Sequence, residues 1–145
     1  MSAQHFLVPI DFSDSSDRAL DCAIELGKKL QARLTLLHVV YLPRLAEIDL
    51  SPYQEEMETD AKKALESCLK RVRDGGLEAT IEIVHGVPFR EIVDMTNDRN
   101  IDLIIMGTHG RTGLQHAFLG SVAEIVVRLA PCPVLVARQS GETPG

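Results

Sequence analysis

The sequence predicts an α/β fold: a single doubly wound domain built on a parallel β-sheet. Short apolar runs alternate with longer amphipathic stretches in the order β-α-β-α-β-α-β-α-β. One run, residues 34–40, is apolar at nearly every position, which is typical of a strand covered on both faces. A glycine-rich stretch, residues 106–122, joins a strand to a helix, an arrangement that suits phosphate in such folds.

The composition is that of an ordinary globular protein, with 45% hydrophobic and 25% charged residues. We expect residues 1–145 to form one domain, with a disordered tail at 140–145. The net charge of -6 argues against a nucleic-acid binder, although backbone dipoles can still hold a small anion. No apolar run approaches the roughly 20 residues needed to span a membrane. The first residues contain no signal-peptide core.

The cysteines and histidines indicate neither a disulfide framework nor a metal site. Cys22, Cys68 and Cys132 are odd in number, far apart and without C-x-x-C spacing. Cys22 and Cys68 fall on apolar helix stripes, where we expect small core residues. The histidines show no metal-binding spacing, so no metal site made of protein ligands is predicted. These features together suit a reducing, cytoplasmic location.

The first half of the chain predicts two strands and two helices. Residues 5–10 form the first strand, with Pro9 near its end because proline has no N–H for the ladder. Residues 11–17 are rich in helix-capping side chains and open the first helix. Its apolar face consists of Ala19, Cys22, Ala23, Leu26 and Leu30. After the strand at 34–40, residues 41–52 carry prolines near both ends and are expected to form a mobile loop.

A long second helix is expected from about Gln54, ending at Gly75-Gly76. Its apolar side consists of Met57, Ala61, Ala64, Leu65, Cys68, Leu69 and Val72. Residues 80–84 alternate polar and apolar, which predicts an edge strand. The remaining elements are a helix at 87–95, a strand at 101–106, a helix at 122–129 and a strand at 134–137.

Three parts of the chain should converge on a ligand, because open α/β sheets bind ligands beyond the carboxyl ends of their strands. Asp11 follows the first strand, Val39 lies at the end of the second, and Gly107 follows the fourth. Asp11 has two interpretations that the sequence leaves open. It either hydrogen-bonds ribose hydroxyls or caps the first helix through a turn into Ser13.

The start of the fourth helix also has two competing interpretations. Gly120-Ser121-Val122 offers free backbone donors and a hydroxyl to a phosphate. Ser121 and Glu124 also match a capping box, in which the Glu124 carboxylate would repel that phosphate. Within the loop, Arg111 either pairs with phosphate oxygens or is simply solvated.

Several enzyme motifs are absent from the sequence. It contains no G-x-x-x-x-G-K-[ST], no G-x-G-x-x-G after the first strand and no G-x-S-x-G. No activated nucleophile stands beside a base. Only His109, Arg111 and a bound metal could assist catalysis.

The glycine-rich stretch reads Gly107-Thr108-His109-Gly110, then nine residues, then Gly120-Ser121. This spacing resembles the nucleotide motif of the universal stress proteins, and the chain resembles that family from about residue 5 to residue 138. The opening Val8-Pro9-Ile10-Asp11-Phe12-Ser13 and the closing Cys132-Pro133-Val134-Leu135-Val136 are also similar to that family. Three separated matches in the right order make the resemblance specific.

The resemblance implies a five-stranded parallel sheet of order 3-2-1-4-5 with four helices, and membership of the ATP-binding branch. Asp11 would then hold the ribose and the Val39 backbone would read the adenine edge. Base and sugar would be lined by Pro9, Ile10 and Met106. The ribose and phosphates of ATP, AMP or ADP would be surrounded by Gly107, His109, Gly110, Gly120, Ser121 and Val122. Arg111 lies in a variable part of the motif, where it could pair with phosphate oxygens. Any Mg²⁺ or Mn²⁺ would be held through the phosphates.

The resemblance also implies a homodimer joined through the last strand, Val134–Ala137, and a protein partner that the sequence does not identify. The function expected is a nucleotide-binding stress-response or regulatory module with no or slow ATP hydrolysis. The first alternative is a phosphotransferase or nucleotidyltransferase of the same broad fold. The second is a dimeric interaction protein that binds no nucleotide.

Overall fold

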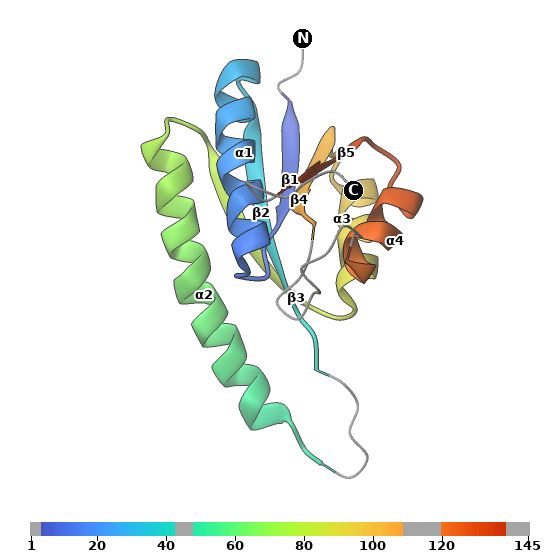
Figure 1. The fold of residues 1–145 in the computed structure, drawn as a ribbon. Coiled ribbons are helices and arrows are strands. Elements are labelled where there is room, and N and C mark those ends of the chain that lie inside the picture. Colours follow the sequence, from blue (N-terminus) through green and yellow to red (C-terminus); the bar gives the residue numbers. More distant parts are fainter. Residues whose placement is uncertain (1–3, 43–47, 109–119, 139–145) are drawn as a thin grey trace.

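The computed structural model describes residues 4–42, 48–108 and 120–138. Within these ranges, strands and helices alternate as the sequence predicts (Figure 1). The elements are β1 (His5–Pro9), α1 (Asp14–Leu30), β2 (Arg33–Val40), α2 (Ser51–Asp74), β3 (Ala79–His85), α3 (Pro88–Asp98), β4 (Leu103–Gly107), α4 (Ser121–Leu129) and β5 (Val134–Ala137). The described strands form one parallel sheet of order β3-β2-β1-β4-β5, which confirms the predicted order and places β3 at an edge.

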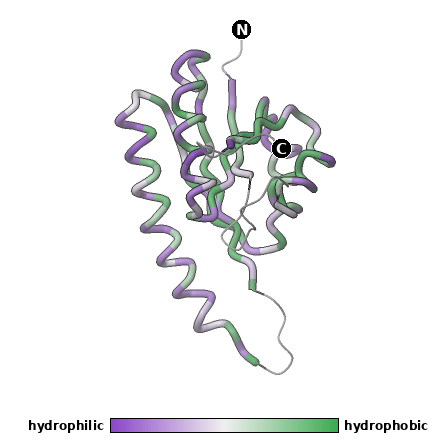
Figure 2. The backbone as a smooth tube through the Cα atoms, viewed as in Figure 1, coloured by the Kyte–Doolittle hydropathy of each residue, from purple (hydrophilic) through white to green (hydrophobic). Residues whose placement is uncertain are grey.

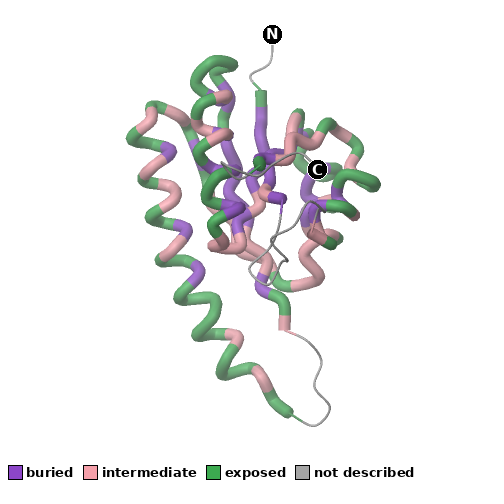
Figure 3. The backbone as a smooth tube through the Cα atoms, viewed as in Figure 1, coloured by how far each residue is buried: buried purple, intermediate pink, exposed green. Residues whose placement is uncertain are grey.

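Helices cover both faces of the sheet, with α1 and α2 on one side and α3 and α4 on the other (Figure 1). Because successive strand residues point to opposite faces, the core has two parts. One, beneath α1 and α2, contains Phe6, Val8, Leu36 and Ile105. The other, beneath α3 and α4, contains Leu7, Leu37, Ile104 and Met106. Figure 3 shows the buried residues gathered along the central strands.

The second helix begins earlier than expected. It starts at Ser51 rather than Gln54, so the expected loop is wrong at its last two residues. Pro52 stands in the first turn, where its missing N–H has no intrahelical acceptor to lose. Residues 43–47 of the expected loop lie outside the described residues. No helix of the described residues is long and apolar enough to cross a membrane.

Two residues assigned to buried helix faces are exposed instead. Leu30, the last residue of α1, is 48% exposed, and Met57 of α2 is 39% exposed. The 24 residues of α2 span about 36 Å, whereas the seven residues of β3 span about 23 Å. The amino-terminal part of α2 therefore extends beyond the sheet and is largely exposed and hydrophilic (Figures 2 and 3).

Cys22 and Cys68 are half-buried and pack against the core on the α1 and α2 side, as expected. Burial raises the pKa of both thiols above the usual range, which keeps them protonated at neutral pH. Cys132 is also free and half-buried, against the other part of the core.

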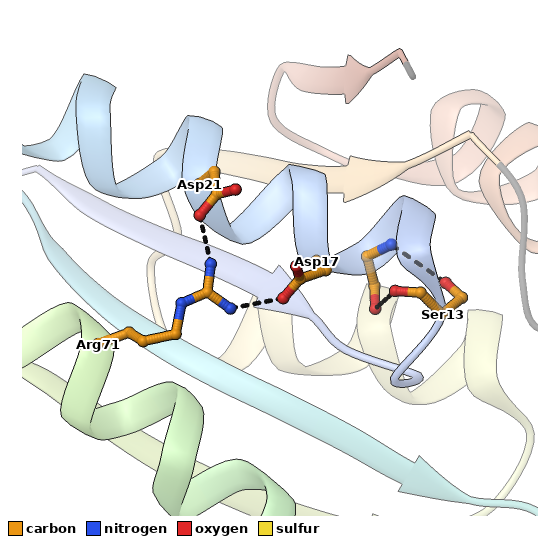
Figure 4. A network of polar contacts seen from close by, with 5 residues as sticks. Ser13, Asp17, Asp21 and Arg71 are labelled. Atoms are coloured by element: carbon orange, nitrogen blue, oxygen red, sulfur yellow. Dashed lines mark hydrogen bonds and ion pairs between the residues drawn. The ribbon is translucent and has the colours of Figure 1, made fainter. Parts of the chain in front are cut away.

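A charged contact joins α2 to α1. The Arg71 guanidinium donates to Asp17 at 2.5 Å and also to Asp21, one turn further along α1 (Figure 4). At the start of the same helix, Ser13 Oγ accepts from the Ser16 N–H at 3.1 Å. The ion pairs link α1 to α2, and the Ser13 cap stabilises the first turn of α1, which borders the candidate site.

Candidate functional site

A pocket of about 210 Å³ opens at the carboxyl ends of β1, β2 and β4. Nine of the twelve predicted site residues line it: Pro9, Ile10, Asp11, Val39, Met106, Gly107, Gly120, Ser121 and Val122. The other three, His109, Gly110 and Arg111, lie outside the described residues. The fold thus brings together segments that are far apart in the sequence.

Sequence reasoning missed seven further lining residues: Ser16, Leu37, His38, Pro88, Ile92, Thr108 and Ala123. Pro88 and Ile92 come from α3, which carries no motif. Only their place in the chain could have indicated them. A helix that follows a parallel strand begins at the edge of the sheet where ligands bind. For His38 the available signal was its neighbour Val39, which was a predicted site residue.

The structure confirms that Asp11 forms a turn into the first helix, and this turn does not exclude a contact with ribose. Its Oδ1 accepts from the Ser13 N–H at 3.0 Å and from the Ser13 hydroxyl at 2.5 Å, which forms the expected turn into α1. Oδ2 has no partner among the described residues, and the half-buried side chain lines the pocket. One oxygen fixes the carboxylate while the other stays available to a ligand.

The loop between β1 and α1 is held in an uncommon conformation. Phe12 has a φ of 65°, in the left-handed region that bulky residues rarely adopt. Its ring lies against the His38 ring, with centroids 4.7 Å apart. His38 Nδ1–H donates to the Ile10 carbonyl at 2.7 Å. These contacts fix the segment that carries Asp11 into the pocket.

The backbone of Val39 faces the pocket. Along β2, the Arg33 N–H donates to Gln4 O at 3.0 Å and the Leu37 carbonyl accepts from the Ile10 N–H at 2.7 Å. Every second residue of β2 therefore directs its N–H and C=O toward β1. Val39 is the next such residue, and β1 has already ended at Pro9. Its N–H and C=O have no backbone partner on that side among the described residues.

Gly107 lies where β4 meets the first turn of α1. A Cβ atom at this position would lie 2.6 Å from the carbonyl carbon of Ser15 and 2.7 Å from its oxygen. Only glycine permits this approach of strand to helix. The first glycine of the motif is therefore required by packing, whatever else it contacts. Close by, the Gly120 N–H donates to Thr108 O at 2.7 Å, which holds the start of α4 next to the end of β4.

Three of the described helices, α1, α3 and α4, begin beside the pocket, and they differ in how their first N–H groups are satisfied. The start of α1 is capped by Ser13 and carries Asp14 and Asp17 in its first turn. The start of α3 has no side-chain cap, but Pro88 in its first turn lacks an N–H and so offers one donor fewer. The start of α4, with Gly120 as N-cap, has no side-chain cap. Its first N–H groups have no intrahelical acceptors and border the pocket.

The capping-box interpretation of α4 is wrong. Glu124 does not turn back to the helix start. Its Oε1 accepts from Arg128 at 3.1 Å, one turn further along. Although Glu124 belongs to the first turn of α4, its carboxylate pairs with Arg128 and leaves the first N–H groups of the helix uncapped. The electropositive end of α4 can therefore bind an anion.

The described lining combines an apolar part with few charges. Pro9, Ile10, Leu37 and Met106 offer apolar surface, and Asp11 is the one carboxylate among the described lining residues. That part of the lining contains no lysine or arginine, so an anion would be held by backbone N–H groups and the helix dipole. The arrangement suits a flat apolar group joined to a hydroxylated link and an anion.

Comparison with known proteins agrees with the fold and the motif. The model of the universal stress protein family matches residues 2–138. The universal stress protein YxiE of Bacillus subtilis (strain 168) is 34% identical over 146 residues, which cover 91% of this chain and 97% of that protein.

Two solved structures have the same fold. Universal stress protein UspA from Lactobacillus plantarum superposes with a TM-score of 0.85 at 30% identity, covering 95% of this chain and 99% of its own. A family protein from Arabidopsis thaliana with AMP bound has a TM-score of 0.71 and covers 95% of this chain and 93% of its own. At 19% identity, that likeness is one of fold. From its fold, its motif and these matches, the chain belongs to the universal stress protein family.

Proposed function

We propose that the pocket binds an adenine nucleotide, ATP or its products ADP and AMP, and that the protein acts as a nucleotide-dependent stress-response or regulatory module. The uncapped start of α4 is the observation that carries this proposal, because it borders the same pocket as Asp11 and the Val39 backbone. The presence of AMP in a protein of the same fold is consistent with it.

The roles of the described site residues in this proposal follow from their chemistry. The N–H and C=O of Val39 meet the acceptor and donor on the adenine edge. Asp11 Oδ2 accepts from ribose hydroxyls, since Oδ1 is occupied by Ser13. The first N–H groups of α4, from Ser121 and Val122, bind phosphate. Apolar contacts to base and sugar come from Pro9, Ile10 and Met106. The roles of His109, Gly110 and Arg111 stay predictions from the motif.

A divalent ion would draw its ligands mainly from the nucleotide. Mg²⁺ and Mn²⁺ prefer carboxylate and phosphate oxygens. Asp11 is the one carboxylate of the described lining, and one of its oxygens already accepts twice from Ser13. The residues present therefore fit an ion that arrives with the phosphates.

We further propose that hydrolysis is slow or absent. Phosphoryl transfer requires groups that position the attacking oxygen and neutralise the developing charge. His38 is the described lining residue most suited to act as a base, and its Nδ1 is bound to a backbone carbonyl. An assay with excess ATP and Mg²⁺ separates this proposal from a phosphotransferase, because rapid multiple turnover would favour the enzyme.

The ribose contact is tested with two nucleotides and one substitution. We expect Asp11→Asn to weaken ATP binding about tenfold, the cost of a charged hydrogen bond. The same substitution should barely change the affinity for 2′,3′-dideoxy-ATP, which has no hydroxyls for the carboxylate. Calorimetric titration measures both. Equal losses for the two ligands would argue against a ribose contact, and no binding of ATP by the unmodified protein would remove the nucleotide proposal.

We also propose a homodimer joined through β5 and a cytoplasmic location. β5 is an edge strand whose residues Val134, Leu135 and Val136 are all apolar and only half-buried. An apolar edge of this kind invites pairing, and a twin strand across a two-fold axis would cover it. The three free cysteines suit a reducing compartment.

A further inference from the structure

The hydrogen-bond ladder between β1 and β2 stops one step before the pocket. Pro9 pairs with Leu37, and the Ile10 N–H donates to the Leu37 carbonyl at 2.7 Å. In a regular parallel ladder the next bond would run from the Val39 N–H to the Ile10 carbonyl. That bond is not formed.

The Ile10 carbonyl is bound instead by the side chain next to Val39. His38 Nδ1 lies 2.7 Å from Ile10 O. A carbonyl only accepts, so Nδ1 carries the proton whether the ring is neutral or charged. The Phe12 ring packs against the imidazole at an interplanar angle of 36°, which limits rotation of the ring away from the carbonyl.

We propose that His38 is a positioning residue of the nucleotide site. By binding the Ile10 carbonyl, it ends the β1–β2 ladder and leaves the N–H and C=O of Val39 for the edge of the base. The role toward the base rests on the proposed function, whereas the effect on the ladder does not. Removal of the imidazole donor would let the Ile10 carbonyl accept the Val39 N–H, which extends the ladder by one bond and occupies the group that meets adenine.

This arrangement selects adenine over hypoxanthine. Adenine presents an acceptor at N1 beside the N6 amino donor, which complements the N–H and C=O of one strand residue. Hypoxanthine has a donor at N1 and a carbonyl at C6, so both pairings are reversed. A site with fixed backbone groups rejects such a reversal because its own polar groups are left unpaired.

The ladder is tested without any nucleotide, by amide hydrogen exchange of the ligand-free protein. In the unmodified protein, the Val39 amide should exchange rapidly and the Leu37 amide slowly. His38→Leu should slow exchange at Val39 at least about tenfold as the new bond forms. His38→Asn places an amide N–H where Nδ1 stands and should keep Val39 rapid. If the Val39 amide of the unmodified protein exchanges as slowly as its Leu37 amide, the proposal is overturned.

The effect on the base is tested by titrating ATP and inosine triphosphate, which share ribose and phosphates. His38→Leu should reduce the preference for ATP about tenfold, and His38→Asn should retain it. A general loss of structure would weaken both ligands together and leave their ratio unchanged, which would overturn the role toward the base. If the unmodified protein binds neither nucleotide, the proposed function and this role both fail, and the exchange rates still decide whether His38 ends the ladder.

Discussion

At the scale of single residues, Gly107 has the clearest consequence for stability. Gly107→Ala places a Cβ within 2.7 Å of the Ser15 backbone, which belongs to a packed helix and cannot move as a side-chain tip can. We expect a loss of about 1–3 kcal/mol in the free energy of unfolding. Urea denaturation measures this loss.

A second substitution identifies which atoms cause that cost. Ser15→Gly removes the Oγ atom, which would lie 2.3 Å from the new Cβ, but leaves the Ser15 carbonyl in place. The penalty of Gly107→Ala should therefore persist in the Ser15→Gly background. Full recovery of stability would contradict a backbone clash and assign the cost to the hydroxyl alone.

His5 should make stability fall in mild acid. Burial, followed by the charge of Arg33, holds the pKa of His5 below the ordinary value of 6.5, although Asp102 opposes both. As the pH falls below 6.5, the unfolded chain binds a proton at this residue before the folded chain does. Stability is thus present above that pH and declines below it.

The contribution of His5 is isolated by comparison with His5→Gln, whose amide can still bond Thr35 as His5 Nε2 does at 2.7 Å. Between about pH 7.5 and about pH 5.5, urea denaturation should show a steeper loss for the unmodified protein than for the variant. Equal losses of stability in the two proteins would contradict a lower pKa of His5 in the folded state than in the unfolded state.

The residues of the site show how far sequence reasoning reaches. The positions of Asp11, Val39 and Gly107 followed from chain order and the rule that parallel strands end at one edge. The direction of the Glu124 side chain could not be predicted in this way. Whether it caps the helix start or pairs with Arg128 depends on side-chain rotamers rather than on spacing. The role of His38 also depends on a contact with Ile10, 28 residues away in the chain, that no local pattern encodes.

At the scale of the elements, α2 changes character along its length. Leu65 is fully buried against the sheet, whereas Met57, on the same apolar stripe, is 39% exposed beyond it. We expect Leu65→Ala to cost about 2–5 kcal/mol and Met57→Ala about 0.5 kcal/mol or less. Urea denaturation of the two variants measures the difference. Similar costs would show that the amino-terminal part of α2 is covered in solution.

The boundaries of the elements were predictable where one physical signal dominates. Val134–Ala137 was predicted without error because Pro131 and Pro133 precede it and the apolar run is short. The start of α2 was missed because Pro52 was interpreted as part of a loop, although proline is equally at home in a first helical turn. Met57 was misplaced because periodicity identifies a face without showing where the sheet beneath it ends.

At the scale of the whole molecule, the proposed dimer predicts a difference between the two edges of the sheet. Val136→Lys on β5 introduces a charge into the proposed interface and should shift the protein toward monomer. Thr80→Lys on β3 is the matched control, since Thr80 is an exposed residue of the opposite edge. Sedimentation velocity measures both. Equal dissociation by the two lysines, or none by Val136→Lys, would contradict pairing through β5.

The contact between Gly107 and Ser15 also bears on how such sequences diverge. A descendant that lost its ligand would be free to change the groups that serve the ligand, yet the Ser15 backbone would still exclude any side chain at 107. Glycine at this position is therefore inherited with the fold. Gly120 and Ser121, at the uncapped start of α4, are not constrained by that contact. Their loss would therefore indicate a lineage that no longer binds a nucleotide.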